Sequence, residues 1–536
     1  MPPKKSEERR RDWFEDDEEI RLLKNGKKGI LAVVFGRFTI IALLVLIEFA
    51  LIILAAHYLG EYSSAFYLLS RLLSVAAIFY LINNSGNPTT KITWIVLIFA
   101  VPAVGLTLYL IVRLDFGHRA IKSRLQTVIA ETAPLCPLNL ELMERLRADA
   151  PGLRGLAAYA YRTASGMVYE NNAVRYLPSG EAKFEALLDA LEKAEHFIFL
   201  EYFIIDEGVM WGRVLKVLEE KVRAGVEVRV LYDGMCAFSR LPYRYPRKLE
   251  ALGIRCKMFA PLRPVASTYY NNRDHRKIVV VDGRVAFTGG VNLADEYINI
   301  GSRFGHWKDA ALMVEGEAVR SFTLLFLQMW AIDEHSTDDF ASYLDASVPC
   351  AAPQPGYVLP YADSPLDDER VGENFYLNIL DRADRYVHIM TPYLILDDEM
   401  ITALSNAAKR GVDVQIILPH VPDKKYAFAL AKGHYRELLR AGVRIFEYTP
   451  GFVHAKVFVS DDSRAVVGTI NLDYRSLYLN FENAVYLCGV PAIADIESDF
   501  AATRERCREI MHDDWKTNPF MTRVVAVLLR LFAPLL

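Results

Sequence analysis

The sequence predicts an α/β protein of two similar lobes, each a mixed sheet flanked by helices, which follow N-terminal transmembrane helices. Three observations carry this prediction. Segments of strand and helix character alternate through residues 121–513, their order occurs twice, and three long apolar segments lie within residues 38–113. With 536 residues, of which 52% are hydrophobic, the chain is too long for one ordinary domain and too apolar to be disordered.

The first 113 residues predict a membrane region. Residues 1–37 are charged and of mixed sign, and the apolar segments Phe38–Tyr58, Ala65–Ile82 and Ile92–Val112 each approach the roughly 20 residues needed to cross hydrocarbon. Several such segments in succession are not typical of a cleaved signal peptide. We therefore expect a multi-pass protein of the cell membrane.

The charges around this region do not agree with three crossings. Basic residues flank it on both sides, from Arg21 to Arg37 and from Arg113 to Arg124, and such residues favour the cytoplasmic side. Two cytoplasmic ends require an even number of crossings. Either one segment is re-entrant or interfacial, or the charge rule fails here; we expect the part that follows the membrane region to be cytoplasmic.

Each predicted lobe begins with the same order of strand, helix and strand. In the first lobe, residues 121–335, these elements are Phe197–Ile205, Gly212–Ala224 and Val226–Tyr232. In the second lobe, residues 375–513, they are Tyr386–Leu394, Glu399–Arg410 and Val412–Leu418. The repeated order predicts a duplication.

Two further segments lie outside the lobes. Residues 336–374 show no periodic pattern and contain five prolines, so we expect a linker that runs over the surface. Residues 514–536 end in the apolar stretch Val524–Leu536, which is too short to span a membrane. This stretch is predicted either to lie in the membrane interface or to dock as a helix on the soluble core.

Charge and cysteine content exclude some classes of function. The net charge is −4, from 62 basic and 66 acidic residues, so no overall positive field is available to hold nucleic acid. The six cysteines lie far apart, without a C-x-x-C pair, which indicates neither a zinc site nor a disulfide scaffold. We expect buried thiols in a reducing compartment and no nucleic-acid partner.

Two stretches share the frame H-x-K-x4-D-x6-G-x2-N. The first contains His275, Lys277, Asp282, Gly289 and Asn292, and the second contains His454, Lys456, Asp461, Gly468 and Asn471. The two histidines are 179 residues apart, which is too long for a solenoid repeat and indicates a domain-sized duplication. A single copy is explained equally well by a surface strand with a solvated lysine, but the pair predicts one active site formed from two half-sites.

Residues of these types suit phosphoryl transfer. A neutral imidazole can attack phosphorus, and a second, protonated imidazole can give its proton to the leaving alkoxide. Lys277 and Lys456 face the same side as their histidines and can neutralise phosphate oxygens. Asn292 and Asn471 either donate hydrogen bonds to those oxygens or serve as turn residues. Such a site requires no metal and no cofactor.

Four acidic residues are further candidates. Asp282 and Asp461 sit at turns after the histidine strands, where a structural role is at least as consistent as a chemical one. A reacting imidazole also needs an acceptor that holds its other nitrogen. Asp309 and Glu482, on the strands that follow, are the nearest candidates for this orienting role.

These residues resemble the phospholipase D superfamily and, more narrowly, the bacterial cardiolipin synthases. The likeness extends over EYFIIDEG from Glu201, NNRDHRKIVVVDG from Asn271, GGVNLADEY from Gly289, TPYL from Thr391 and GTINLDYRS from Gly468. It implies one site between two similar lobes and a phosphohistidine intermediate, with His275 as nucleophile and His454 as acid and base, although the symmetry of the motifs allows the roles to be exchanged. A third apolar segment departs from many members, which have two.

The resemblance also implies the reaction. One phosphatidylglycerol gives its phosphatidyl group to the enzyme and releases glycerol, and the glycerol hydroxyl of a second phosphatidylglycerol accepts the group, so that cardiolipin forms. The expected partners are this lipid and the bilayer, while the oligomeric state is not predicted. Three alternatives stay open: hydrolysis to phosphatidate, transfer to another alcohol, and a membrane scaffold that has kept the fold without the chemistry.

Overall fold

The computed structural model describes residues 63–84, 87–113, 116–242, 244–261, 271–301, 303–334, 337, 339–512 and 529–530. The charged segment 1–37 and the apolar segment Phe38–Tyr58 lie outside these residues. Of the C-terminal segment 514–536, only Leu529 and Arg530 are described.

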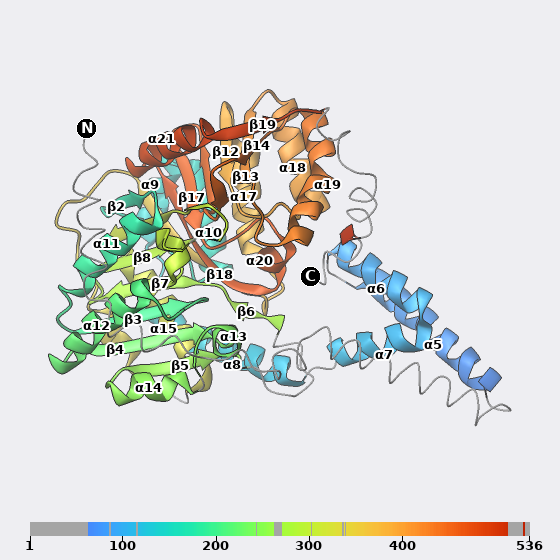
Figure 1. Ribbon diagram of the computed structural model, residues 1–536, viewed down its shortest axis with the longest axis horizontal. Helices are drawn as coiled ribbons and strands as arrows, with labels where there is room; N and C mark the ends of the chain where they lie inside the picture. Colours follow the sequence, from blue (N-terminus) through green and yellow to red (C-terminus); the bar gives the residue numbers. More distant parts are fainter. Residues whose placement is uncertain are drawn as a thin grey trace.

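The first lobe is built on a seven-stranded mixed sheet among the described residues (Figure 1). Strands β3, β4 and β5 pair in parallel, and the others pair antiparallel. In sheet order the strands are β2 (Ala173–Leu177), β10 (Ala311–Glu315), β8 (Val285–Gly289), β7 (Lys277–Val281), β3 (Phe197–Tyr202), β4 (Glu227–Asp233) and β5 (Arg255–Phe259).

The second lobe repeats this sheet. Its strands, in the corresponding order, are β11 (Tyr357–Asp363), β18 (Asn480–Cys488), β17 (Arg464–Gly468), β16 (Val457–Ser460), β12 (Tyr386–Met390), β13 (Asp413–Pro419) and β14 (Arg444–Tyr448). Two short strands extend its edges, β1 (Tyr169–Glu170) beside β11 and β19 (Cys507–Ile510) beside β14. The prediction of two similar α/β lobes is confirmed.

Both faces of each sheet are buried, because side chains alternate along the strands. In β3, Ile198 and Leu200 pack under helices of the first lobe, whereas Phe199 points into a central core that also contains Val457 and Val459 of the second lobe. Phe458 points the other way, into the outer core of the second lobe. The two sheets are therefore joined by one shared apolar layer.

Helices cover the remaining faces. The outer face of the first sheet lies under α11 (Gly180–Leu191), α12 (Val209–Arg223) and α14 (Tyr245–Ala251). The outer core of the second lobe is formed with α9 (Leu140–Asp149), α10 (Pro151–Thr163), α17 (Val371–Arg382), α18 (Asp398–Lys409) and α19 (Lys425–Ala441). The central core includes residues of α8 (Phe116–Thr132), α15 (Val319–Trp330) and α21 (Ala492–Arg504).

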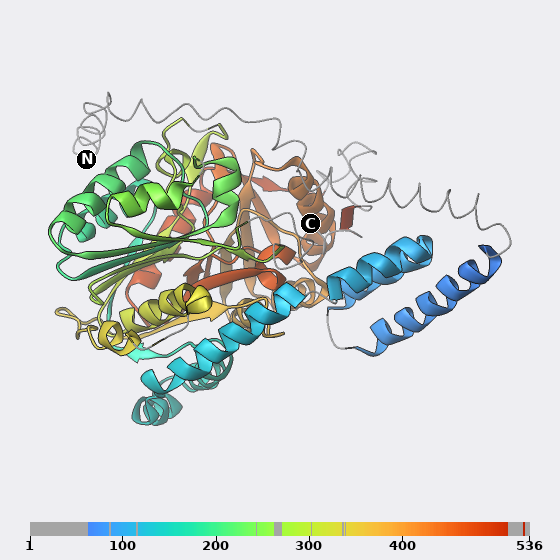
Figure 2. The same cartoon turned by 90° about the horizontal axis from the view of Figure 1, so that it is seen from below.

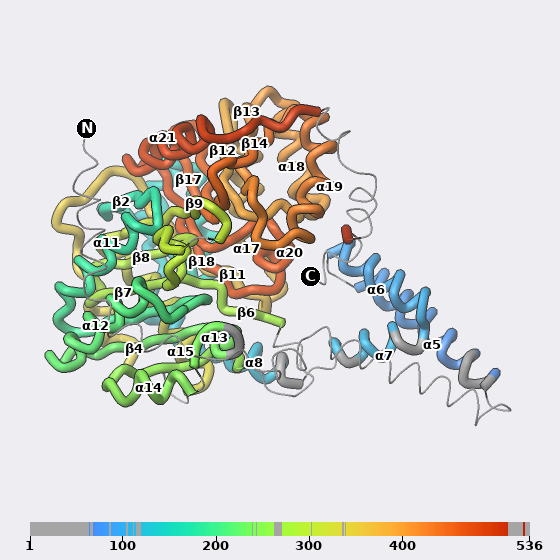
Figure 3. The backbone as a smooth tube through the Cα atoms, viewed as in Figure 1, coloured from blue at the N-terminus to red at the C-terminus, as the bar shows by residue number. Residues whose placement is uncertain are grey.

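Two short strands pair across the lobes. β6 (Arg273–Asp274), from the first half of the chain, pairs with β18 of the second lobe. β9 (His306–Lys308) pairs in parallel with β15 (Gly451–Val453). Figure 3 shows β6 and β9 beside segments of the second lobe. Both exchanges lie next to the histidine motifs.

Part of the expected linker 336–374 is regular structure. Residues 357–363 form β11, which pairs along its length with β18, and α17 begins at Val371. Pro360 fits this strand because the N–H of Ala362, two residues on, donates to Ala164 on the side away from β18. The nitrogen of Pro360 faces that same side, so no ladder hydrogen bond is lost.

The described N-terminal helices form an arm that stands away from the lobes (Figure 2). It consists of α5 (Ser63–Asn83), α6 (Pro88–Ala100) and α7 (Pro102–Arg113). The predicted segment Ala65–Ile82 lies within α5, whereas Ile92–Val112 is divided between α6 and α7 at Val101 and Pro102. Across the part of the chain that the structure describes, no helix combines the length and apolarity required to cross a membrane.

Candidate active site

His275 and Lys277 lie where β6 passes into β7. The backbone N–H of His275 donates to the carbonyl oxygen of Phe481 in β18 at 2.9 Å. The Nζ of Lys277 donates to the carbonyl oxygen of His275 at 2.5 Å. The first half-site is therefore fastened to a strand of the second lobe, with its ammonium group beside its imidazole.

His454 and Lys456 lie at the matching junction of β15 and β16. The backbone N–H of His454 donates to the carbonyl oxygen of Lys308, which ends β9 of the first lobe, at 2.6 Å. The Nζ of Lys456 donates to the carbonyl oxygen of His454 and lies 2.9 Å from its Nδ1. Each histidine segment is thus held by a strand of the opposite lobe.

The orienting carboxylates are also exchanged between the lobes. The Nδ1 of His275 lies 2.8 Å from Oε2 of Glu482, and the Nδ1 of His454 lies 2.7 Å from Oδ2 of Asp309. Both acceptors follow the histidine motif of their own lobe, as expected, but each contacts the histidine of the other lobe. Their carboxylates are fully buried, so these contacts are shielded from water.

Burial raises the pKa of Glu482 to about 7, and with Glu482 and Asp309 ionised this contact selects one tautomer for both rings. With Nδ1–H donating to a carboxylate, the lone pair of Nε2 is the one available to attack or to take a proton. Burial, followed by the charge of Lys456, lowers the pKa of His454 to about 3. Burial, Lys277 and Lys456 hold the pKa of His275 well below its ordinary value. Without substrate, both imidazoles are therefore neutral near pH 7.

The two lysines are buried and act on both half-sites. Burial lowers the pKa of Lys277 to about 8, against the favourable charges of Glu482 and Asp274. Burial lowers the pKa of Lys456 to about 7, although the charge of Asp309 opposes this shift. The charge of Lys456 lowers the pKa of His275, and that of Lys277 lowers the pKa of His454. The two motifs therefore form one electrostatic unit.

Aromatic side chains that the sequence did not single out form the walls of this unit. Phe203 packs edge-on against His275 with 4.9 Å between ring centroids. Tyr297 and Trp307 each lie 5.3 Å from the ring of His454. Phe203 falls within the stretch EYFIIDEG from Glu201, and Trp307 is two residues before Asp309, so proximity to predicted residues was the available signal.

The two asparagines of the motifs have different surroundings. Asn292 accepts the backbone N–H of Ile204 at 3.0 Å and donates to the hydroxyl of Tyr297 at 2.6 Å. The Oδ1 of Asn471 is buried and has no hydrogen-bond partner in the described part of the chain. Asn292 is therefore held by Ile204 and by Tyr297 of the aromatic wall, whereas the side-chain carbonyl oxygen of Asn471 has no such partner among the described residues.

Asp282 and Asp461 lie at the other end of the histidine strands. Asp282 accepts the backbone N–H groups of Glu195, His196 and Phe197 at 2.7 to 2.8 Å. Asp461 accepts those of three successive residues, Asp384, Arg385 and Tyr386, in the same way. Asp282 lies five positions after Lys277, about 17 Å along an extended strand. These carboxylates hold the starts of β3 and β12, and the structure does not bring them to the imidazoles.

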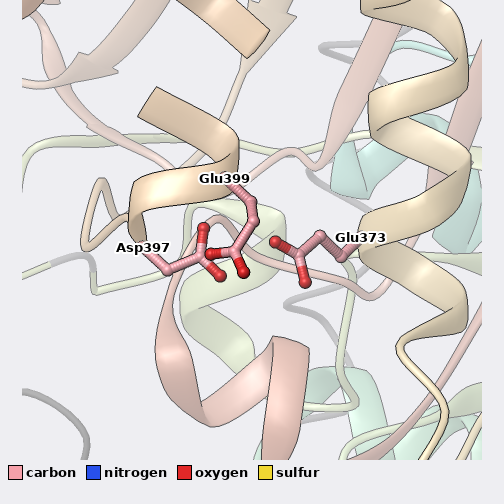
Figure 4. Close-up of side chains that lie close together, drawn as sticks. All are labelled: Glu373, Asp397 and Glu399. Atoms are coloured by element: carbon pink, nitrogen blue, oxygen red, sulfur yellow. The ribbon is translucent and has the colours of Figure 1, made fainter. Parts of the chain in front are cut away.

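A separate acidic group lies on α17 and at the start of α18. The carboxylates of Glu373, Asp397 and Glu399 converge there (Figure 4), close enough to hold a metal ion. Groups of the chain contact all three, although burial and the neighbouring Asp397 raise the pKa of Glu373 to about 8. Arg370 lies 3.5 Å from Glu373 and 3.3 Å from Glu399, and the hydroxyl of Tyr478 lies within hydrogen-bonding distance of both Glu373 and Asp397.

Family models match most of the folded part of the chain. The model described as "Cardiolipin synthase, PLD-like domain" matches residues 187–330 and 376–504, one match for each lobe. The model described as "Phospholipase_D-nuclease N-terminal" matches residues 72–113, within the arm.

Individual proteins agree with these matches. An uncharacterized protein of Streptococcus mutans is 49% identical over 86% of this chain and its own full length. A protein of Geobacillus kaustophilus named cardiolipin synthase is 35% identical over 88% of this chain and 94% of its own. The crystal structure of a Haemophilus influenzae phosphatidylserine synthase, 14% identical, has a similar fold with a TM-score of 0.53 over 72% of this chain and 98% of its own.

The repeated sheet, the paired histidine and lysine motifs and the matches to both lobes lead to one assignment. The chain belongs to the cardiolipin synthase family of phospholipase D-like proteins.

Proposed function

We propose that this chain transfers a phosphatidyl group from one phosphatidylglycerol to the glycerol hydroxyl of a second, with cardiolipin and glycerol as products. The observation that carries this proposal is the crossed pair of dyads, His275 with Glu482 and His454 with Asp309, in a chain of this family. Two oriented imidazoles are what a double displacement at phosphorus requires. Curated relatives that carry the name cardiolipin synthase support the choice of lipid.

In the first step, Nε2 of His275 attacks the phosphorus of the donor lipid. A P–N bond forms, the P–O bond to glycerol breaks, and His454 gives a proton to the leaving alkoxide. The free imidazole of His454 is neutral, but the bound phosphate adds a negative charge beside it, which favours its protonated form. Burial opposes the ionised form of Asp309, but its contacts with His454 and the charge of Lys456 outweigh burial and hold the pKa of Asp309 below its ordinary value. Asp309 therefore stays ionised and stabilises that imidazolium.

In the second step, the glycerol hydroxyl of another phosphatidylglycerol attacks the same phosphorus. His454 takes its proton, the P–N bond to His275 breaks, and cardiolipin leaves. Lys277 and Lys456 neutralise the phosphate oxygens in both steps, and the amide NH2 group of Asn471 donates to one of them. Because the motifs are symmetric, the reverse assignment of the two histidines is the alternative within this mechanism.

The substrate implies a membrane location, and the arm supports it. Leu68, Leu72 and Phe79 of α5 are each about 60% exposed, which is unusual for a soluble surface. We propose that the arm, with the apolar segment Phe38–Tyr58 that precedes it, attaches the protein to the cell membrane as a multi-pass region. The lobes then face the cytoplasm, in line with the basic residues that flank the region.

The test uses the purified full chain in vesicles of labelled phosphatidylglycerol. The expected products are cardiolipin and free glycerol in equal amounts, with neither formed by His275→Ala or His454→Ala. Phosphatidate in place of cardiolipin would identify hydrolysis as the reaction and overturn the proposal. Vesicles that also contain another alcohol show whether the enzyme prefers phosphatidylglycerol as the acceptor of the phosphatidyl group.

A further inference from the structure

Two buried carboxyl groups lie close to His275. Glu201 is in β3 and Asp274 is the residue before His275, and both are fully buried. Neither oxygen of Glu201, nor Oδ2 of Asp274, receives a hydrogen bond from an N–H or O–H group within the described residues. The two carboxyl groups instead face each other within hydrogen-bonding reach.

Such a pair is stable only with a proton between its members, because two adjacent ionised carboxylates repel each other strongly away from water. The proton belongs on Glu201. Asp274 accepts the backbone N–H of Arg276 at 3.2 Å, and the charges of Arg276 and Lys277 favour its ionised form. Burial and the charge of Asp274 raise the pKa of Glu201 well above its usual range.

Asp274 links the His275 segment to the first lobe. Its backbone pairs with Phe481 of the second lobe, and its N–H donates to Asp233 of β4, which is ion-paired with Arg273. Its side chain contacts Glu201 in β3. Residues 273–276 are therefore held by contacts with both lobes, and the contact between Asp274 and Glu201 is one of those made with the first lobe.

The second lobe shows that the fold itself does not require this pair. Glu201 faces Ile278 across the sheet, three residues after His275, and Met390 faces Val457, three residues after His454. Met390 is thus the counterpart of Glu201, and Val453, the residue before His454, is the counterpart of Asp274. Both are fully buried apolar side chains. A carboxyl pair in one half-site and an apolar pair in the other indicates a role specific to His275.

We propose that Glu201 is a positioning residue, whose protonated carboxyl group donates to Asp274 and thereby holds His275 in line with the lipid phosphate. The inference rests on the proposed function for its activity readout. The carboxyl pair makes the two half-sites functionally unequal although their motifs match.

The test compares three variants with the wild-type chain in phosphatidylglycerol vesicles. Glu201→Gln keeps a donor that needs no titrating proton, so its kcat stays within a few-fold of wild type. Glu201→Leu removes the donor and lowers kcat about a hundredfold with little change in KM, as a misplacement of order 1 Å would. The double variant Glu201→Met with Asp274→Val copies the second lobe and loses kcat to a similar degree while it folds.

The pH dependence separates positioning from packing. The folded-state pKa of Glu201 is raised, so the stabilisation that it gives is present at low pH and is lost as the pH rises through that value. The ratio of kcat for Glu201→Gln to that of wild type therefore increases as the pH rises. The charges of Arg276 and Lys277 act on the pair in both proteins, and Asp233, which is ion-paired with Arg273, accepts the backbone N–H of Asp274 in both. The ratio therefore reports the difference that the carboxyl group of Glu201 makes.

An infrared spectrum provides a readout that does not depend on activity. The chain has other buried carboxyl groups with raised pKa values, among them Asp363 and Glu373, so the readout is the difference between the wild-type and Glu201→Gln spectra. This difference contains the band of one protonated buried carboxyl group, that of Glu201. The inference is overturned if wild type is active and Glu201→Gln loses as much kcat as Glu201→Leu, if the double variant keeps full activity, or if the difference spectrum lacks the carboxyl band. A wild-type chain that makes no cardiolipin would contradict the proposed function instead, and the infrared band then decides the carboxyl pair alone.

Discussion

His454 and Asp309 meet across the boundary between the lobes, with Nδ1 of the histidine 2.7 Å from Oδ2 of the aspartate. His275 and Glu482 repeat this contact with the lobes exchanged, at 2.8 Å. Because each imidazole is oriented by a residue of the other lobe, the separation of the lobes sets the geometry of both half-sites at once. The shared apolar layer between the sheets therefore serves the chemistry as well as the stability of the fold.

Replacement of Asp309 by asparagine is expected to slow the reaction without unfolding the chain. The amide has nearly the same shape but cannot stabilise an imidazolium at His454, and it favours the wrong tautomer. We expect kcat to fall by about 10²- to 10⁴-fold with KM little changed, measured as cardiolipin formed in phosphatidylglycerol vesicles. Asp345→Asn, at an exposed carboxylate, is the matched control, and equal rates for the two variants would remove Asp309 from the mechanism.

The two buried lysines predict a fall in activity on the alkaline side. The pKa values of about 7 for Lys456 and about 8 for Lys277 mean that their positive charges disappear as the pH rises through this range. We expect kcat/KM, which reports the free enzyme, to decrease over the same interval. In Lys456→Arg the charge at that position persists, so the remaining decrease follows Lys277 and moves to higher pH. A flat profile in wild type would contradict the assignment of phosphate binding to these lysines.

Asp282 is expected to matter for stability more than for chemistry. Its carboxylate accepts three backbone N–H groups, so Asp282→Ala leaves buried donors unpaired and lowers the free energy of unfolding by about 1–3 kcal/mol. Thermal unfolding measures this loss, and kcat per folded molecule is expected to stay near wild type. Asp462→Ala, at an exposed turn carboxylate, provides the comparison. A large loss of kcat with unchanged stability would mean that Asp282 takes part in catalysis.

The sequence was sufficient to predict the repeated elements because apolar periodicity and the two motifs are local signals. Predicted strands such as Tyr386–Leu394 and helices such as Glu399–Arg410 correspond to β12 and α18. The pairing of Glu482 with His275 was out of reach, since it joins residues 207 positions apart through the order of strands in two sheets. The same holds for β6 and β9, which leave their own sheet to pair with the other lobe.

The predicted linker, residues 336–374, shows a different limit of prediction from sequence. Five prolines in residues 336–374 predicted irregular chain, but Pro360 sits in β11 at a position whose nitrogen faces away from β18. Whether a proline interrupts a strand depends on which neighbour is present on its nitrogen side, and that is a property of the assembled sheet. The alternation of apolar residues in YVLPYAD was masked by the prolines around it.

Gly290 offers a final test of the contact between the lobes. It lies fifteen residues after His275, where the second lobe has Thr469, whose hydroxyl donates to Glu482. A Cβ atom at Gly290 would lie 2.0 Å from Oδ1 of Asp309 and 2.9 Å from the carbonyl oxygen of His454. Gly290→Ala must therefore push Asp309 away from His454, and we expect a loss of kcat of about 10²-fold. Gly155→Ala, where no atom lies within 4 Å of the added methyl group, is the control.

The double variant Gly290→Ala with Asp309→Asn shows whether Gly290 acts through Asp309. If the methyl group slows the reaction only by displacing that carboxylate, Gly290→Ala adds little to the effect of Asp309→Asn, and the two losses in transition-state free energy fail to add. A cycle of the four proteins, assayed in the same vesicles, measures this coupling. Full additivity would mean that the methyl group disturbs His454 through its backbone instead, and that the space beside Gly290 is not what keeps the carboxylate on the imidazole.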